Sequence, residues 1–264
     1  MIEVSPKVYK VAETKVCRDG LYEYLKDISQ GGWNSNAITD SDLLSECAGR
    51  VCYRSWSAYD ENKKEGTNQN VTKIREDNTE YVQNVIKQAH GSILEHSNIS
   101  FIWHNVSRVV THELVRHRAG MAYSQESLRY VRLDELKVWL PDEIKADKEL
   151  YELYKHTVRY LEGIQKKCNQ LTKLDGKDFA EKKKWTSRFR RLAPLGLGTT
   201  ILVTGNLRAW RHICNMRGNK HVEEEIELIM NQVVPHLKEF APAVFADLNF
   251  VEEEGWKFSL NPKP

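Results

Sequence analysis

The clearest pattern in the sequence is a long amphipathic stretch between residues 147 and 171. Mostly apolar side chains recur there at alternating steps of three and four residues: Leu150, Tyr154, Thr157, Leu161, Ile164, Cys168 and Leu171. Because an α-helix has 3.6 residues per turn, this spacing places them on one helical face. The chain must therefore accommodate one long helix whose apolar face needs a packing partner.

Four shorter segments also show helical spacing: Asp40–Cys52, Asp77–Gln88, Ser107–Arg118 and a stretch that begins near Asn219. The last of these carries Glu223, Glu224 and Glu225 in its first turn, where the helix dipole favours anions. Pro235 has no amide hydrogen to donate, so we expect it to kink or end this helix.

Extended segments are fewer than helical ones. Ile99–Trp103 with Val106, and Leu197–Leu207, are rich in β-branched and aromatic side chains, which predicts strands. Residues 20–36 and 60–72 are polar and rich in Gly, Asn, Ser and Lys, which is typical of surface loops. The mixture lacks the regular βαβ alternation of a doubly wound fold, and no linker is evident. We expect an α/β (α+β) fold in a single domain over residues 1–264.

Charge and composition exclude several classes of protein. The chain of 264 residues has 39 Lys and Arg against 37 Asp and Glu, a net charge of +2, which argues against a broadly basic nucleic-acid binder. No apolar run approaches the 20 or so residues of a membrane span, and the first ten residues lack the pattern of a signal peptide. The five cysteines form no CxxC pair, so we expect reduced thiols and a cytoplasmic protein.

The densest group of polar side chains lies between residues 112 and 132. On a helix, Arg116 and Arg118 would point in different directions, and Glu113, one turn earlier, would orient Arg116. If the chain is extended after them, Ser127 and Arg129 share one face. A hydroxyl beside a guanidinium suits a phosphate, because Arg offers a fork of donors matched to its oxygens. A solvated basic face is the alternative.

Three other segments concentrate similar side chains. Arg188, Arg190 and Arg191 precede Pro194, although on its own this segment is better explained as an exposed helix face. Residues 206–221 hold eight Asn, Arg and His side chains besides Lys220, and Arg208, His212 and Asn215 would share a helical face there. The fourth segment is residues 90–96, which begins and ends with His.

Several standard chemistries lack their motifs. There is no GxGxxG or P-loop for a dinucleotide or triphosphate, and no HExxH or Cys/His zinc spacing, so we expect no metal. Ser127 lacks the GxSxG context of an activated nucleophile. Cys214 has basic neighbours but no evident general base, and we interpret it as a structural residue.

Together the four segments resemble the flavin-dependent thymidylate synthases. Arg116-His117-Arg118 followed by Ser127-Leu128-Arg129-Tyr130 is similar to the family signature, in which Ser follows RHR after seven residues. The other segments match in the family's order: His90-x-Ser92-x-x-Glu95-His96, Arg190 four residues before Pro194, and Asn206-x-Arg208 with His212, Arg217 and His221. The resemblance covers about residues 80–132 and 186–248, with 133–185 as a helical insertion. Here eight residues separate Arg118 from Ser127, and we place the extra one within Ala119–Ala122.

The resemblance implies a fold and a reaction. The fold would be of the thymidylate synthase-complementing type, a mixed or antiparallel sheet flanked by helices, in a homotetramer with active sites shared between subunits. The enzyme would be a methyltransferase that makes dTMP from dUMP, with methylenetetrahydrofolate as carbon donor, FAD as hydride carrier and NADPH as reductant. It implies no membrane or nucleic-acid partner.

The resemblance also assigns residues by their position in the motifs. The FAD-binding positions are Ser92, Arg116, His117, Arg118, Asn206, Arg208, His212 and His221, although His221 is equally well explained as a structural residue. The positions that bind dUMP are Glu113, Arg116, Gln125, Ser127, Leu128 through its backbone, Arg129, Arg190 and Arg217. Arg217 would also be catalytic, because it would stabilise negative charge that develops on the pyrimidine.

Two other functions stay open from the sequence. A related flavoenzyme acting on another pyrimidine nucleotide, or giving another one-carbon product, would share these motifs. A nucleic-acid-binding module that uses the Arg clusters is more distant, because the net charge is close to neutral and no recognised binding motif is present.

Overall fold

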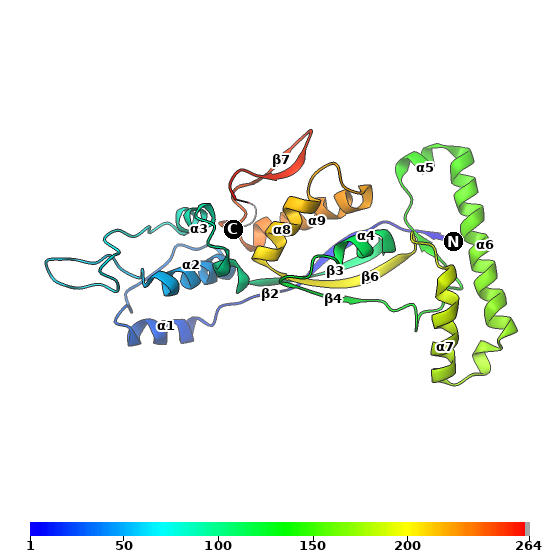
Figure 1. Ribbon diagram of the computed structural model, residues 1–264, viewed down its shortest axis with the longest axis horizontal. Coiled ribbons are helices and arrows are strands. Elements are labelled where there is room, and N and C mark those ends of the chain that lie inside the picture. The colour runs from blue at the N-terminus through cyan, green and yellow to red at the C-terminus, as the bar shows by residue number, and fades with distance from the viewer. Residues whose placement is uncertain (262–264) are drawn as a thin grey trace.

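A four-stranded antiparallel sheet forms the centre of the molecule in the computed structural model, which describes residues 1–261 (Figure 1). Its strands lie in the order β2 (Lys7–Glu13), β3 (Asn98–Ser107), β6 (Gly198–Asn206) and β4 (Met121–Gln125). Two small pairs lie outside it: β1 (Ile2–Glu3) with β5 (Lys137–Val138) in parallel, and β7 (Leu248–Val251) with β8 (Gly255–Phe258) antiparallel. The expected mixed α/β fold is confirmed.

Strand β3 shows why the sheet has one buried face. Ile99, Phe101 and Trp103 alternate with more exposed residues, and all three are buried. Beyond Trp103 the register with β6 shifts, and Asn105 takes a φ of 59°. Because of this irregularity, the Val106 side chain, rather than that of Asn105, is buried in the core.

Helices α8 (Leu207–Arg217) and α9 (Glu224–Phe240) pack on the buried face (Figure 1). The Trp210 side chain is fully buried there, and its ring meets that of Phe101 edge to face at 5.3 Å. On the opposite face of the sheet, Tyr9 and Leu202 are exposed. The sheet is therefore covered by its own helices on one side only.

Side-chain caps fix where most helices begin. The oxygens of Thr39, Asp77, Ser107, Asp147 and Asn206 accept hydrogen bonds from amides in the first turn. They start, in turn, α2 (Asp40–Tyr53), α3 (Asn78–Lys87), α4 (Arg108–Leu114), α6 (Lys148–Leu171) and α8. Asp178 caps α7 (Phe179–Phe189) in the same way. Helices α2, α3, α4 and α6 start close to where the sequence predicted them.

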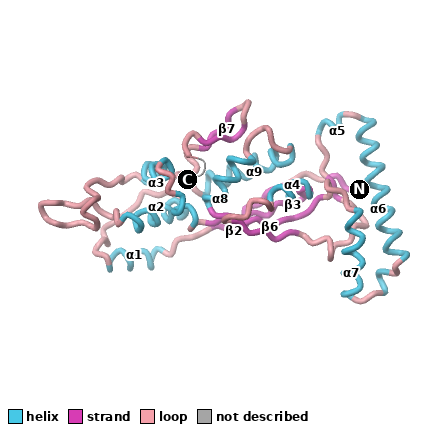
Figure 2. Tube along the Cα trace, in the orientation of Figure 1, coloured by secondary structure: helices cyan, strands magenta, loops and turns pink. Residues whose placement is uncertain are grey.

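The N-terminal part departs from the sequence prediction in one place. Residues 20–36 were expected to form a loop, but α1 (Arg18–Asp27) occupies the first part of it. The loop prediction was wrong because Leu25 is buried in a small core with Leu43, Cys47 and Trp56, and this tertiary packing outweighs the polar composition. Residues 60–72 do form an irregular loop, the long excursion between α2 and α3 in Figure 2.

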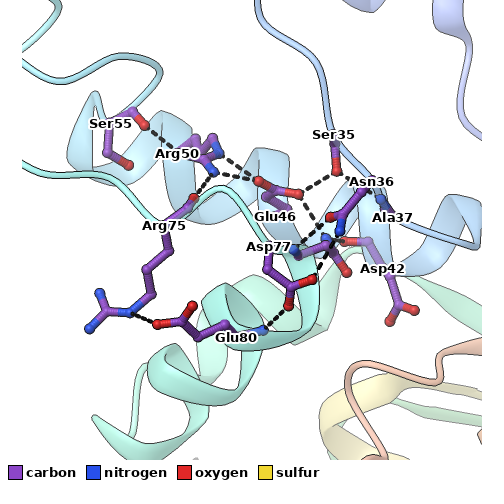
Figure 3. A network of polar contacts seen from close by, with 11 residues as sticks. Ser35, Asn36, Ala37, Asp42, Glu46, Arg50, Ser55, Arg75, Asp77 and Glu80 are labelled. Carbon is purple, nitrogen blue, oxygen red and sulfur yellow. Dashed lines mark hydrogen bonds and ion pairs between the residues drawn. The ribbon is translucent and has the colours of Figure 1, made fainter.

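The buried Arg50 side chain closes that loop (Figure 3). Its Nη1 atom donates to the Ser55 carbonyl at 2.6 Å and its Nη2 atom to the Arg75 carbonyl at 2.7 Å. The Glu46 carboxylate, also buried, accepts from Arg50 Nε at 2.7 Å and balances its charge. One guanidinium group thus holds both ends of the excursion.

Helix α6 forms the far end of the molecule with α5 (Asp142–Ala146) and α7 (Figure 1). The helix is confirmed, but its predicted apolar face is only partly buried: Leu161 packs against the small core around Leu136, whereas Tyr154 and Leu171 are 44% and 72% exposed. The residues that α6 buries include Glu162 and Gln165, which accept from the Leu136 amide and donate to the Phe189 carbonyl. Polar contacts with loop backbone therefore set its rotation.

Two helix boundaries also differ from the sequence prediction. The helix expected over residues 107–118 ends at Leu114, so the RHR triplet lies in the turn that follows α4. The last helix begins at Glu224 rather than near Asn219, and it continues past Pro235 to Phe240. In the described part of the chain, three short 3₁₀ helices complete the fold: η1 (Gly91–Glu95), η2 (Leu174–Gly176) and η3 (Arg190–Leu192). Within residues 1–261, no helix has the length and apolarity that crossing a membrane requires.

Candidate functional site

Arg217, the last residue of α8, is held by two side chains from the α4 region. Its Nη1 atom donates to Glu113 Oε2 at 2.6 Å, and its Nε atom donates to His117 Nε2 at 3.2 Å. The Arg217 and Glu113 side chains keep 23% and 34% of their surface exposed, so ligands can reach the pair. The prediction that Glu113 orients Arg116 was wrong, because Arg116 lies beyond the end of α4 and is exposed.

The contact with Arg217 defines the protonation state of His117. Burial, then the positive charge of Arg217 and then His212 lower the pKa of His117 below its ordinary value. Arg217 Nε donates to His117 Nε2, which requires a lone pair on that nitrogen. His117 is therefore neutral at neutral pH and carries its proton on Nδ1.

A cavity of about 560 Å³ adjoins this group. It is lined by Glu95, Ala119, Gly120, Asn206, Arg208, Ala209 and His212. The His212 ring lies 5.3 Å from the His117 ring, which joins the cavity to the Arg217 group. Three of the residues expected to hold FAD thus line one cavity, and the Arg208 guanidinium is fixed there by Glu95 at 2.5 Å.

Gly120 allows its backbone to lie close to the Asn206 side chain in the cavity wall. Its φ is +70°, and a Cβ atom on it would lie 2.7 Å from the side-chain oxygen and nitrogen of Asn206. The Gly120 carbonyl also accepts from the Asn206 amide at 3.1 Å. The extra residue relative to the family signature was expected within Ala119–Ala122. Ala119 and Gly120 lie in a turn before β4, and a turn can absorb one residue without rotating an element.

A second group of cations lies at the other end of the sheet, around Arg108 at the start of α4. Its Nη2 atom donates to the Glu126 carbonyl at 3.0 Å, while its Nε atom is buried and has no hydrogen-bond partner within residues 1–261. Burial lowers the pKa of Arg108, the charge of Glu126 opposes this, and the charge of Arg190 lowers it further. Two guanidinium groups close enough to repel each other favour an anion between them.

The segment from Ser127 to Arg129 is a turn rather than a strand. The Tyr130 amide donates to the Ser127 carbonyl at 2.9 Å, so the expected extended arrangement is wrong. Ser127 Oγ instead accepts from the Arg129 amide at 3.4 Å. The Arg129 carbonyl accepts from Thr186 Oγ1 at 2.5 Å, which attaches this turn to α7, the helix that leads to Arg190.

The other expected site residues are placed but make fewer contacts. Ser92 is exposed in η1, the element that also carries Glu95. Arg118 lies over the Tyr123 ring at 5.8 Å, and Gln125 Nε2 donates to Thr111 Oγ1 at 3.0 Å. Leu128 packs against the small core around Leu136, and His221 is exposed with its amide bound to Asn219 Oδ1.

The sequence analysis did not identify Arg108 as a site residue. It also did not predict that Glu95 contacts Arg208. Arg108 follows the Ser107 cap and looks like an ordinary first-turn residue. Its distance of 82 positions from Arg190 hides their proximity. Cys214 was interpreted correctly as structural, because it is fully buried and burial raises its pKa to about 12. No group of three or more His, Cys, Asp or Glu side chains in residues 1–261 is arranged to hold a metal ion.

The fold is shared with a solved protein structure. The structure is similar to that of the UMP/dUMP methylase PolB from Streptomyces cacaoi bound with 5-Br dUMP, with a TM-score of 0.62. The likeness covers 93% of this chain and 96% of that one at 16% sequence identity, so it defines the fold alone.

Sequence comparison then defines the family. The family model described as "Thymidylate synthase complementing protein" matches residues 36–243. Flavin-dependent thymidylate synthases from Mycobacteroides abscessus and Mycobacterium avium are 34% and 36% identical over 233 and 235 residues, each match covering 85% of this chain and 88% of the relative. That from Mycolicibacterium gilvum is 33% identical over 99% of this chain and 98% of its own length. The chain belongs to this family, as its motifs predicted.

Proposed function

We propose that this protein is a flavin-dependent thymidylate synthase that converts dUMP to dTMP. The observation that carries the proposal is Arg217, a cation held by Glu113 and His117 beside a cavity that three expected flavin-binding residues line. Family membership supports it, because the curated relatives bear that name. Methylenetetrahydrofolate as carbon donor, NADPH as reductant and a cytoplasmic location belong to the same proposal.

The residues around Arg108 suit the phosphate of dUMP. Arg108 Nε is buried without a hydrogen-bond partner in residues 1–261. Arg190 is near enough for its positive charge to lower the pKa of Arg108. The turn with Ser127 and Arg129 is attached to the same region through Thr186. A phosphate here would accept charge-assisted hydrogen bonds and relieve the repulsion between the guanidinium groups.

The cavity beside His212 suits part of FAD. Its volume, about 560 Å³, lies within the range of roughly 300–1,000 Å³ of small-molecule sites. Asn206, Arg208 and His212 provide donors and acceptors for a polar cofactor. The bound flavin would supply hydride transfer from NADPH to the transferred carbon.

The positions of these two sites favour a shared active site. Arg108 follows the residue that pairs with Gly198, the first residue of β6, and Asn206 is the last residue of that strand. Nine residues of strand extend about 26 Å from the first to the last, at roughly 3.3 Å per residue. A flavin that must meet the pyrimidine ring would then be shared most directly between copies, as in the expected homotetramer.

Arg217 would act on the pyrimidine itself. When a carbon nucleophile forms on the ring, negative charge develops on its carbonyl oxygens. A cation already held by Glu113 and His117 can stabilise that charge without reorganising, and such a group contributes roughly 3 kcal/mol or more in the transition state. The neutral His117 ring accepts a hydrogen bond from Arg217 without adding a second positive charge beside it.

The test begins with the visible spectrum of the purified protein. We expect oxidised-flavin bands that bleach on addition of NADPH, and a nucleotide product 14 mass units heavier than dUMP, about one CH₂, when methylenetetrahydrofolate is present. UMP is assayed in parallel, because the structural neighbour is named for both nucleotides. A colourless protein that gives no methylated nucleotide contradicts the proposal, whereas a product from UMP alone favours the related flavoenzyme.

A further inference from the structure

We propose that the C-terminal hairpin of β7 and β8 positions Arg217, with Gly255 and Trp256 as positioning residues. The inference rests on the proposed function, because it takes Arg217 as the catalytic cation. The hairpin lies outside residues 36–243, the part that the family model matches, so the family motifs do not assign it a role.

The hairpin pairs with the loop that directly follows Arg217. The Trp256 amide donates to the Gly218 carbonyl at 2.8 Å, and the Lys220 amide donates to the Glu254 carbonyl at 3.2 Å. Between these bonds, Asn219 and Gly255 form an antiparallel bridge. The backbone that leaves α8 is therefore held like a short strand at the edge of the hairpin.

The absence of a side chain at position 255 allows this close approach. Gly255 has a φ of +82°, a conformation that L-residues with a side chain rarely adopt. A Cβ atom there would lie 2.4 Å from the Gly218 carbonyl oxygen and 3.0 Å from the Asn219 Cα. Any side chain at position 255 must displace the loop or the hairpin.

The hairpin is itself anchored to two helices of the core. Trp256 Nε1 donates to Asn231 Oδ1 on α9 at 2.8 Å. Just before the hairpin, Asp247 accepts from both terminal nitrogens of Arg211 on α8, at 2.7 and 2.9 Å, and both side chains are buried. The hairpin can therefore act as a brace between the core and the loop after Arg217 rather than as a free arm.

Arg217 is consequently fixed from two directions. Glu113 and His117 hold its guanidinium group, and the hairpin holds the main chain that follows it. A cation that stabilises a transition state must be placed closely, and an error of 1 Å at such a position can cost about 100-fold in rate. Loosening the brace should affect catalysis more than nucleotide binding.

The first experiment compares Gly255→Ala with Gly163→Ala. Gly163 lies on α6, and a Cβ atom there would meet nothing within 4 Å, so this variant controls for the change of residue type. For Gly255→Ala we expect a kcat about tenfold lower, for a displacement smaller than 1 Å. The KM for dUMP should stay within about twofold, because a loss confined to the transition state lowers kcat alone. Hydrogen exchange of the amides in residues 214–222 should be faster, and Gly163→Ala should match the wild type in all three measurements.

A second variant keeps the proposal testable if Gly255→Ala does not fold. Trp256→Phe removes the hydrogen bond to Asn231 and keeps an aromatic ring against Phe250, which lies 5.3 Å from it. We expect the same pattern at a smaller size, a kcat lowered by about threefold. A variant with faster exchange at residues 214–222 and an unchanged kcat overturns the proposal, as does unchanged exchange in both variants.

The wild-type assay separates the two proposals. If the wild type forms dTMP and the variants keep full kcat, the positioning role fails and the proposed function stands. If the wild type forms no dTMP, the proposed function fails, and the catalytic part of this inference fails with it. The exchange measurement then decides only whether the hairpin holds the loop.

Discussion

Arg217 and Glu113 stand 104 positions apart in the sequence, yet Arg217 Nη1 donates to Glu113 Oε2 across 2.6 Å. The contact joins the end of α8 to α4, and so brings together two of the four segments that carry the family motifs. Glu113 thereby has a role in the protomer before any nucleotide binds. It holds the cation that the proposed reaction needs.

Replacing Arg217 with Ala should remove most turnover while FAD stays bound. The loss of a preorganised cation worth roughly 3 kcal/mol lowers kcat by about 100-fold or more. The rate of dTMP formation and the flavin absorbance of the same sample measure the two effects. Turnover close to wild type in a sample with full flavin content would show that Arg217 is not catalytic.

Replacing Glu113 should act through Arg217. Glu113→Gln keeps an oxygen that can accept from Arg217 Nη1, so we expect it to retain more activity than Glu113→Ala. The double variant Glu113→Ala with Arg217→Ala should be little worse than Arg217→Ala alone, because residues that act as a unit are not additive. Losses that multiply in the double variant would mean that Glu113 works independently of Arg217.

The cluster around Arg108 should determine nucleotide affinity. Arg108→Ala and Arg129→Ala should each raise the KM for dUMP about tenfold or more, since a hydrogen bond to a charged group contributes roughly 1.5–3 kcal/mol. Arg188→Ala is the matched control, because Arg188 is exposed on α7 and lies over the Trp185 ring at 4.5 Å. If both variants keep the wild-type KM, the phosphate binds elsewhere.

Two buried carboxyl groups should make the protein less stable as the pH rises. Burial raises the pKa of Asp42 from 3.8 to about 6 and that of Glu225 from 4.5 to about 7. Between pH 4 and 7, about the span of these values, the folded state binds protons that the unfolded state has released, so the free energy of unfolding falls with increasing pH. Below and above this window these two groups contribute no slope.

Urea unfolding at several pH values measures this slope. Asp42→Asn and Glu225→Gln should each flatten it, because the substituted groups do not titrate. Glu61→Gln, at an exposed position in the loop between α2 and α3, should leave the slope unchanged. Variants that keep the wild-type slope would contradict the assignment.

Local patterns in the sequence predicted much of the fold, and particular contacts explain the misses. The β-branched and aromatic side chains of residues 99–103 predicted β3, and helical spacing after Asp77 predicted α3. The rotation of α6 could not be predicted in the same way, because Glu162 is buried through a bond to the Leu136 amide. A periodicity identifies the helix but does not identify the polar partners that bury one side of it.

In the site, too, local sequence patterns predicted some features, and tertiary contacts determined the others. The motifs predicted which segments carry functional residues, and the cavity brings Asn206, Arg208 and His212 together as expected. Spacing along a helix relates only residues three or four positions apart, so it paired Glu113 with Arg116 rather than with Arg217. Arg108 escaped notice because its significance depends on Arg190, which only the tertiary structure brings near it.

Arg50 donates hydrogen bonds to the carbonyls of Ser55 and Arg75, and this has a consequence for proteolysis. A protease that cuts the excursion near residue 63 would sever the chain without separating its two pieces. Both new ends would stay bound through the same guanidinium group, so the nicked protein should elute as one species and run as two bands only after denaturation.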